Sequence, residues 1–579
     1  MQVEGNGKIK KQFTEWHCAA GVGAKLRVKS VASDCATPCS ANVRRKMSFA
    51  MGTAKLDRML WLGMLLMMVV ASLAQEKPGT SLAPSKMPKL GTVDQRFVSY
   101  NVEMVEVTGG RFWKPYKSTV PAQEAPKLST PLQANQQVGD SASIFQYRPP
   151  IDLSSPRLRI LAEALGPAYI RVSGSWANSV YFQNDDLPAL KEPPKGFRSV
   201  LTRAEWKGVI DFAHAVNARI VTSVAISPGA RDANGVWTPD QAKALFDYTK
   251  SIGGSIAATE FMNEPTFPGP GGAPKGYDAA AFARDVKVFE PFLRKEMPTT
   301  IFLGPGSIGE GSSLMPAGAM VKLPLSTDKI MEATGPVFDA FSYHFYASVS
   351  SRCAGNTTVA QAFTADWLDR TVAGEAFYAE ARDKYLPGKP IWLTETAQAA
   401  CGGDQFAGQF VDSFRYLNQL GILAQKGVLA VMHNTLAASD YGLLNEETNE
   451  PRPDYWAALL WKRTMGAVVL DPGVTGGPSL RVYAQCMKGH KGGVTLLAMN
   501  IDPKQEQKLI IPLPADRYTL TAPDLTSKTV LLNGVALQAG QDGTLPEIKG
   551  LRVKPGALQL APASITFLTT PSARNAGCM

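Results

Sequence analysis

Residues 255–265, SIAATEFMNEP, have the pattern of an apolar β-strand that ends in the polar tripeptide Asn263-Glu264-Pro265. This stretch belongs to a series, because short β-rich segments alternate with helical patterns from about residue 96 to residue 432. The eight candidate strands are 97–103, 168–173, 219–226, 255–264, 300–304, 338–346, 391–395 and 428–434. Such alternation is typical of βα units and predicts an α/β fold, a (β/α)8 or TIM barrel, over residues 95–465.

Helical patterns fill the connections between these strands. Thr202 and Glu205 form a capping box before an apolar helical face that begins at Trp206. No Gly-rich fingerprint follows the first strand, so a dinucleotide-binding fold loses its main support. After an expected helix at 454–464 the chain changes to alternating short strands, which predicts an all-β sandwich domain over residues 466–579.

The N-terminal segment carries the pattern of a secretory signal. Lys55 and Arg58 precede an apolar run at 59–70, and small residues suited to signal-peptidase cleavage follow it. The apolar run is short for a membrane-spanning helix, although an uncleaved anchor stays an alternative. We expect a secreted or periplasmic protein without stable membrane insertion, in which 1–50 is an extension upstream of the true start, 51–74 a signal peptide and 75–94 a flexible leader.

The net charge does not indicate a partner. The formal charge is +10, but residues 1–74 hold 11 Lys/Arg and 4 Asp/Glu, which leaves only +3 for the remainder. This basicity gives no support for a nucleic-acid partner, and we expect none. The cysteines and the five histidines lack metal-ligand spacing, so we also expect no metal and no cofactor.

Polar residues end several of the expected strands. The active site of such a barrel lies at the C-terminal ends of its strands, where Glu264 ends the fourth strand and Glu395 the seventh. Two carboxylates across one barrel mouth suit glycoside hydrolysis, in which one protonates the leaving oxygen and the other attacks the anomeric carbon. Glu260 lies four residues deeper than Glu264, so a structural ion pair is the better interpretation there.

The motifs around these residues resemble the heparanase-like family 79 glycoside hydrolases, a group of clan A barrels with β-glucuronidase members. The resemblance spans roughly residues 96–578. The matching motifs are Glu260-Phe261-Met262-Asn263-Glu264-Pro265, Leu393-Thr394-Glu395-Thr396, Gly402-Gly403, Asp440-Tyr441-Gly442, Pro453-Asp454-Tyr455-Trp456 and Leu532-Asn533-Gly534.

The resemblance implies roles for individual residues. Glu264 would be the general acid/base and Glu395 the nucleophile of a retaining enzyme. The expected substrate contacts are Asn263 near the sugar 2-hydroxyl, Tyr346 on the nucleophile, His344 lining the cleft, Glu103 on sugar hydroxyls, and Asn434 on the sugar with His433 packing beneath it.

The resemblance also implies a site for a uronate carboxylate. The Tyr441 hydroxyl and backbone N–H groups near Gly402, Gly403 and Ser439 match the positions that bind this group in the family. Ser439 stands where vertebrate members carry Gly, which leaves its N–H available. The expected partner is therefore a glucuronate-containing oligosaccharide or polysaccharide.

Four cysteines follow the signal segment. The resemblance implies a disulfide between Cys486 and Cys578. Cys353 and Cys401 lie just beyond the sixth and seventh strands, so they either form a second disulfide at the cleft rim or stay as two free, buried thiols.

Two departures from the vertebrate members bear on the mode of action. Residues 184–199 are too few to contain the excised linker of those members, so activation by cleavage into two chains is not expected. The segment between Glu103 and Pro156 is long and carries Trp113, Tyr116, Phe145 and Tyr147, which could close one side of the cleft. An ordinary surface excursion is the alternative.

Together these features predict an exo-acting retaining β-glucuronidase. The alternatives are an endo-β-glucuronidase, another clan A retaining glycosidase such as a β-xylosidase or β-glucanase, and a non-catalytic carbohydrate-binding protein.

Overall fold

The computed structural model describes residues 79–116, 144–311, 323, 325–474 and 477–579. The expected extension at 1–50 and the expected signal peptide at 51–74 lie outside these residues. Within the described part of the chain, no helix is both long enough and apolar enough to cross a membrane.

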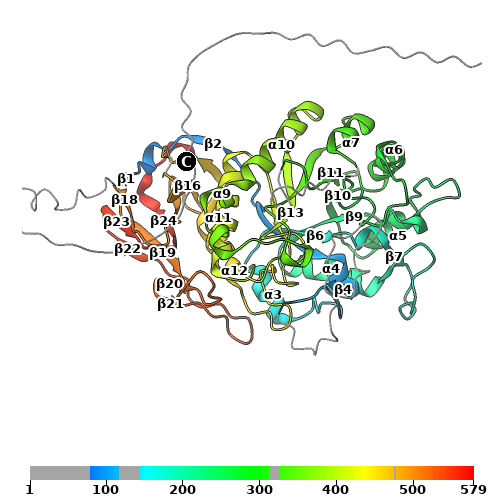
Figure 1. The fold of residues 1–579 in the computed structure, drawn as a ribbon, viewed down its shortest axis with the longest axis horizontal. Helices are drawn as coiled ribbons and strands as arrows, with labels where there is room; N and C mark the ends of the chain where they lie inside the picture. Colours follow the sequence, from blue (N-terminus) through cyan, green and yellow to red (C-terminus); the bar gives the residue numbers. More distant parts are fainter. Residues whose placement is uncertain (1–78, 117–143, 312–322, 324, 475–476) are drawn as a thin grey trace, which may run out of the picture. The chain divides into compact units, whose positions relative to one another are not determined.

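A closed barrel of parallel strands forms the larger part of the described chain (Figure 1), which confirms the predicted α/β barrel. Each observed strand overlaps one of the expected segments. Among the described residues the barrel strands are β3 (Val98–Glu103), β6 (Ala168–Ser173), β9 (Ala218–Ser223), β10 (Ile256–Glu260), β11 (Ile301–Ser307), β12 (Ala340–Tyr346), β13 (Ile391–Ala397) and β14 (Val431–His433).

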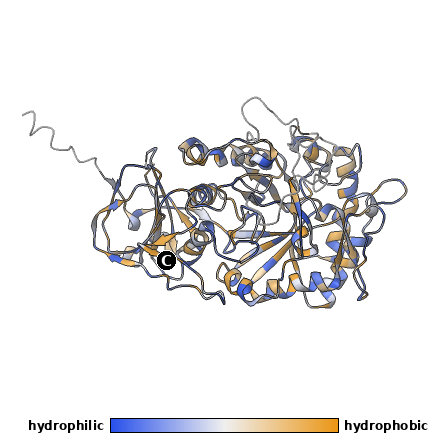
Figure 2. Ribbon diagram, turned by 60° about the horizontal axis from the view of Figure 1, so that its bottom comes forward, coloured by the Kyte–Doolittle hydropathy of each residue, from blue (hydrophilic) through white to orange (hydrophobic). Residues whose placement is uncertain are grey.

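Amphipathic helices connect the strands and cover the outside of the barrel. Thr202 and Glu205 form the expected reciprocal capping box at the start of α4, and Trp206 of this helix is fully buried. Polar and apolar residues alternate along the outer helices in Figure 2, as expected for helices that bury one face. The main connecting helices are α3 (Pro156–Glu163), α4 (Arg203–Ala215), α5 (Asp240–Ser251), α6 (Ala279–Glu296), α7 (Thr327–Thr334), α10 (Arg370–Tyr385), α11 (Phe410–Gln425) and α12 (Pro453–Thr464).

The barrel interior has an apolar end and a polar end. Inward-facing side chains alternate along each strand, so Tyr169 of β6 lies one layer before Arg171, and Ala258 of β10 one layer before Glu260. Tyr169 and Ala258 belong to an apolar cluster that closes one end of the barrel. The polar layers that follow it lie toward the C-terminal ends of the strands, where the site was expected.

The C-terminal region forms the predicted sandwich, and the N-terminal residues join it. One sheet contains β15 (Met465–Leu470), β16 (Leu480–Met487), β17 (Val494–Asn500), β19 (Ala515–Thr521) and β24 (Ser564–Thr570). The second sheet contains β18 (Gln507–Ile511) and β23 (Gly556–Leu560). Apolar residues from both sheets, including Leu480, Leu509 and Leu558, form one core between them.

The expectation of a flexible leader at 75–94 is wrong for residues 79–94. Strand β1 (Thr80–Ser81) pairs with β18, and β2 (Lys89–Thr92) pairs with β15. Leu82 and Met87 are buried in the sandwich core. The Pro and Lys content suggested a linker, but the sandwich supplies strand edges for this segment to pair with, which short-range sequence patterns do not reveal.

The sandwich packs directly on the barrel. Tyr483 of β16 donates a hydrogen bond of 2.7 Å to the amide oxygen of Asn418 on α11, and both residues are buried. Arg481 forms an ion pair of 2.8 Å with Asp369 next to α10. Tyr483, Leu497 and Phe567 of the sandwich share one apolar cluster with the barrel helices, so the two parts form one continuous core.

Candidate active site

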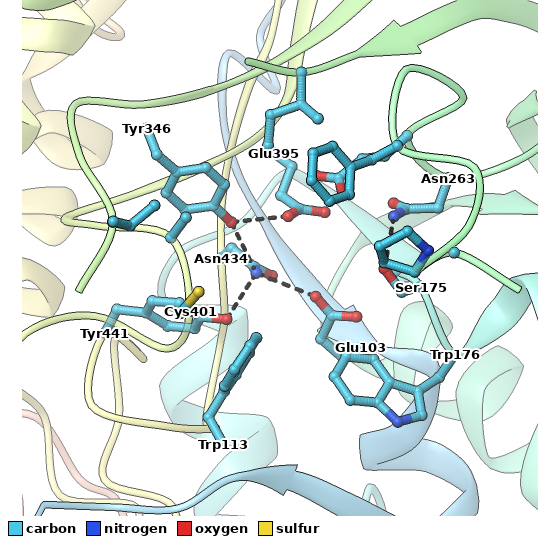
Figure 3. A pocket seen from close by; sticks show the side chains of 18 of the residues that line it. Glu103, Trp113, Ser175, Trp176, Asn263, Tyr346, Glu395, Cys401, Asn434 and Tyr441 are labelled. Atoms are coloured by element: carbon cyan, nitrogen blue, oxygen red, sulfur yellow. Dashed lines mark hydrogen bonds between the residues drawn. The ribbon is translucent and has the colours of Figure 1, made fainter. Parts of the chain in front are cut away.

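A pocket of about 180 Å³ opens at the C-terminal ends of the barrel strands (Figure 3). It brings together polar residues from β3, β12 and β13 and from the segments after β10 and β14, which are far apart in the sequence. The described residues that line it are Glu103, Trp113, Gly174, Ser175, Trp176, Asn263, Glu264, Phe267, Pro270, Gly271, Ile308, Leu323, Tyr346, Val349, Glu395, Ala400, Cys401, Asn434 and Tyr441.

Arg171 lies beneath the pocket and links the carboxylates around it. Its Nη1 donates to Glu395 Oε2 at 2.8 Å, while its Nε and Nη2 donate to Glu260 Oε2 at 3.0 and 2.8 Å. The side chain is only 1% exposed. Burial works against the charged form, but the adjacent carboxylates outweigh it and raise the pKa of Arg171. Arg171 is therefore a fixed positive charge at the floor of the site.

Sequence reasoning missed Arg171. The signal that could have found it was a single charged residue at an inward position of the apolar strand β6, between Ile170 and Val172. An arginine there must either pair with buried carboxylates or destabilise the barrel.

Glu260 has the structural role expected for it. Its Oε1 accepts hydrogen bonds from the hydroxyls of Ser342 at 2.9 Å and Thr394 at 2.8 Å, and its Oε2 faces Arg171. Burial would raise the pKa of Glu260, but Arg171 and these hydrogen bonds lower it. Both oxygens of Glu260 have hydrogen-bond donors and the residue is fully buried. Glu260 therefore holds Arg171 in place.

Glu395 lies on β13 with one face toward the pocket. Tyr346 donates a hydrogen bond to its Oε1 at 2.8 Å, and Arg171 pairs with its Oε2 at 2.8 Å. The structure thus brings Tyr346 to the carboxylate that the resemblance assigned to it. Both carboxylate oxygens of Glu395 have a fixed donor, which orients the group toward the cavity.

Glu264 faces Glu395 across the pocket. One oxygen of each carboxylate and a ring nitrogen of His344 lie within 4.8 Å of one another. Burial raises the pKa of Glu264 to about 7, and Arg171 opposes this only in part. A carboxyl group with such a pKa exchanges its proton near neutral pH.

His344 does not line the pocket, which corrects the role implied by the resemblance. Its side chain is fully buried behind the two carboxylates, and burial lowers its pKa to about 4. Arg171 Nη2 lies 3.2 Å from Nε2 of the neutral ring. Because a guanidinium only donates, Nε2 accepts and Nδ1 carries the proton. Nδ1 then donates to Glu264 Oε1 at 3.0 Å.

Asn263 bridges Arg171 and the pocket. Its Oδ1 accepts from Arg171 at 2.7 Å, which turns its amide nitrogen toward Ser175 at 3.4 Å and the cavity. Its backbone N–H and carbonyl both bind the side chain of Asn178, at 2.8 and 3.0 Å. The strand end before Glu264 is therefore rigidly held.

Glu103 and Asn434 meet on the opposite wall of the pocket (Figure 3). Asn434 Nδ2 lies 3.1 Å from Glu103 Oε1, 3.2 Å from the Tyr346 hydroxyl and 3.0 Å from the Tyr441 hydroxyl. Burial, reinforced by the nearby Glu395, raises the pKa of Glu103 well above its usual value. The structure brings these four side chains together at the cavity.

Tyr441 lines the pocket with its hydroxyl, and His433 lies behind it. The Nε2 atom of His433 donates to the backbone carbonyl of Tyr441 at 2.8 Å, and the ring is fully buried. His433 therefore packs beneath the site and does not reach the cavity.

The Gly402-Gly403 turn and Ser439 lie at the rim beside Tyr441. Gly402 has a φ of 80°, and a Cβ there would lie 2.7 Å from Trp113, so only glycine fits this position. Ser439 donates its hydroxyl to the Gly402 carbonyl at 2.9 Å. Its backbone N–H is not available for a ligand, contrary to expectation, because it donates to the Glu446 carboxylate at 2.8 Å. Neither Ser439 nor the two glycines are among the described lining residues.

Both cysteine pairs in the described residues form disulfides. Cys353 and Cys401 are joined with a Cα–Cα distance of 6.4 Å, so the alternative of two free thiols is wrong. Cys486 is joined to Cys578, the pairing implied by the resemblance. Cys401 lines the pocket, and Arg352 next to the first disulfide binds the carbonyls of Cys401 and Gly403 at 3.2 and 2.7 Å. This rim is therefore cross-linked both covalently and by hydrogen bonds.

The aromatic residues of the 103–156 segment lie in different environments. Trp113 of β4 (Gly110–Trp113) lines the pocket and packs at a tilt on Phe145, with ring centroids 4.4 Å apart. Tyr116 lies on the guanidinium of Arg352 at 3.8 Å, and Tyr147 is exposed. Residues 117–143 lie outside the described part of the chain. In the described residues, only the Trp113 end of this segment contributes to the pocket wall.

The cluster of Glu264, His344 and Glu395 has the atom types of a metal site. Arg171, however, donates to Glu395 Oε2 and His344 Nε2 within this cluster. A fixed guanidinium so close to these atoms opposes a divalent cation by direct charge repulsion. The arrangement suits proton transfer and nucleophilic chemistry between two carboxylates better than metal binding.

Comparisons with known proteins agree with the resemblance. No family model matches the chain. Among curated proteins, heparanase-like protein 1 of Arabidopsis thaliana is 27% identical over 74% of this chain and 86% of its own length. Heparanase of Mus musculus is 29% identical, covering 74% and 88%, and hyaluronoglucuronidase of Hirudo nipponia is 26% identical, covering 74% and 92%.

A solved 4-O-α-L-rhamnosyl-β-D-glucuronidase from Fusarium oxysporum has a similar fold, with a TM-score of 0.55 and 14% identity over 85% of this chain and all of that one. Because the identity is low, this structural similarity supports the architecture alone. These matches cover 86% to 92% of the curated relatives' own lengths. Together with the motifs at Glu264 and Glu395, they support the assignment of this chain to the heparanase-like family of glycoside hydrolases.

Proposed function

We propose that the protein is a retaining β-glucuronidase that removes terminal glucuronate from glycosides. The observation that carries this proposal is the pair of carboxylates, Glu264 and Glu395, with oxygens within 4.8 Å across one pocket and with different surroundings. Retaining glycosidases need a separation of about 5 to 5.5 Å between the two carboxyl groups, whereas inverting ones need room for a water molecule.

The two carboxylates are suited to different tasks. Arg171 and Tyr346 balance the negative charge of Glu395 and orient it, as a nucleophile requires. Burial raises the pKa of Glu264 to about 7, which keeps a proton available in weakly acidic solution. His344 donates to Oε1 of Glu264, so Oε2 is the oxygen that can carry the transferable proton.

The reaction would proceed by double displacement. An oxygen of Glu395 forms a bond to the anomeric carbon as the glycosidic bond breaks, and Glu264 passes its proton to the departing oxygen. A water molecule then gives its proton to Glu264 and attacks the anomeric carbon, which releases Glu395. Arg171 stays charged throughout. The Tyr346 hydroxyl stays within hydrogen-bonding distance of Glu395 as the charge on that carboxylate changes.

Recognition of glucuronate is the finer part of the proposal. Tyr441 and Asn434 place neutral donors at the wall where Glu103 also lies, with no lysine or arginine among the described lining residues. Neutral donors can bind a carboxylate while leaving the catalytic pair undisturbed by another positive charge. The related protein of Hirudo nipponia is named a hyaluronoglucuronidase, which agrees with a glucuronide substrate.

Exo action is proposed because Trp113 covers one side of the cavity. Its ring packs on Phe145 and lies against Gly402, so a fixed aromatic side chain stands on this side of the pocket. Endo action is the alternative within the same family. Export is proposed on the N-terminal signal pattern, and two disulfides suit an oxidising compartment.

A panel of p-nitrophenyl glycosides tests this function. The wild type should cleave the β-glucuronide in preference to the β-glucoside and β-xyloside, and Glu395→Gln should cleave none of them. Preference for the xyloside or glucoside would favour another clan A glycosidase. Binding of a glucuronide by the wild type without turnover would instead favour a non-catalytic carbohydrate-binding protein.

A further inference from the structure

The part of the pocket next to Glu264 is apolar. Glu264 is the proposed acid, so the leaving group departs beside it. The lining residues on the segments that follow Glu264 and β11 include Phe267, Pro270 and Ile308. This wall offers ring faces and aliphatic surface for a leaving group to contact.

Two contacts make this wall rigid. The Thr266 hydroxyl donates to the Ile308 carbonyl at 3.0 Å and accepts from the Ile308 N–H at 3.0 Å, which fixes Ile308 to the segment after Glu264. On the other side, a Cβ at Gly272 would lie 2.3 Å from Ser179, so this segment also packs closely on the turn that follows Trp176. The apolar surface is therefore preformed.

The described residues of this pocket offer no positive charge to a leaving group. None of the described lining residues is lysine, arginine or histidine, whereas three of them are glutamates. Arg171 beneath the pocket is already paired with Glu260 and Glu395. A sulfate group in this position would lose its hydration next to carboxylates and gain no ion pair in return.

We propose that the leaving-group side of the pocket selects neutral groups with an apolar ring face, and that it discriminates against sulfated ones. The proposal rests on the proposed β-glucuronidase function and specifies its substrate class. The ring can be that of an aromatic alcohol or of a neutral sugar, because both present an apolar face to Phe267 and Pro270.

Matched substrates test the discrimination. We expect kcat/KM for phenyl β-glucuronide to exceed that for 4-sulfophenyl β-glucuronide by at least about tenfold. The sulfonate makes its phenol the better leaving group, so chemistry alone would give the opposite order. A second pair, glucuronate β-linked to a neutral hexose and to the same hexose bearing a sulfate, separates the sugar source of the ring from the aromatic one.

A charge placed in the wall should reverse the preference. Phe267→Lys should raise the rate on the sulfophenyl substrate relative to the phenyl one by about tenfold or more, because it supplies the missing cation. Val535→Lys makes the same kind of change at an exposed position of the sandwich and should leave the ratio unaltered. A gain of activity on one substrate excludes simple misfolding.

The outcomes are distinct. Faster cleavage of both sulfated substrates by the wild type would overturn this inference while leaving the β-glucuronidase function intact. An unchanged ratio in Phe267→Lys would also overturn it. Failure to cleave any glucuronide would overturn the proposed function itself, and this inference with it.

Discussion

The two ends of the barrel interior are made by the same strands but have opposite chemistry. At the closed end, side chains such as Leu303, Ala258 and Trp392 form a buried apolar cluster. One or two layers farther along, Arg171 and Glu260 are equally buried but charged. Each charge at this end has a partner within hydrogen-bonding distance, whereas the apolar end needs only close packing.

The comparison indicates which end provides stability and which provides function. Apolar burial stabilises the barrel without specifying any chemistry. A buried ion network gives little net stability, because the cost of removing charges from water offsets their attraction. Its contribution is to hold Glu395 and Glu264 in fixed positions with different hydrogen-bond partners.

The largest expected effect is on the nucleophile. Glu395→Gln should lower kcat by a factor on the order of 10⁴ or more, because no other group can form the glycosyl intermediate. The Tm of the variant should stay close to that of the wild type, because Arg171 keeps its ion pair with Glu260. Steady-state kinetics and thermal unfolding on the same sample measure both. Substantial residual turnover would reject the assignment.

Removal of Arg171 should damage stability and activity together. Arg171→Met leaves Glu260 and Glu395 buried without their cation, which should cost about 3 to 5 kcal/mol in the free energy of unfolding. Denaturant unfolding measures the loss. Raising the acidity should restore part of the lost stability, because protonated carboxyl groups no longer need the cation. Wild-type activity in a stable Arg171→Met protein would contradict the account.

The matched change at the apolar end is Leu303→Ala. This fully buried residue should cost about 2 to 5 kcal/mol in the free energy of unfolding by creating a cavity. At a temperature where the variant stays folded, its pH profile should match that of the wild type. A shifted profile would mean that the two ends are not independent.

A smaller effect is expected at the uronate wall. Tyr441→Phe removes one hydrogen bond to the proposed substrate carboxylate and should slow glucuronide cleavage about ten- to a hundredfold. Cleavage of a glucoside, which lacks the carboxylate, should change little. An equal loss on the two substrates would point to a general packing role for Tyr441.

Some of this organisation could be predicted from the sequence. The strand pattern predicted the barrel, and the strand-end motifs identified Glu264 and Glu395 as residues that meet at its mouth. Arg171 was missed because its partners come from other strands, and only their folded positions explain a charge within β6. The pairing of the Ser439 N–H with Glu446 likewise depends on loop geometry that local sequence does not encode.

The most direct test of the central claim is the anomeric configuration of the first sugar released from a β-glucuronide, followed by NMR before mutarotation. With Glu264 and Glu395 placed as they are, the enzyme should release the β-anomer first, because two displacements restore the original configuration. An initial α-anomer would mean a single displacement by water, and would contradict the assignment of Glu395 as the nucleophile.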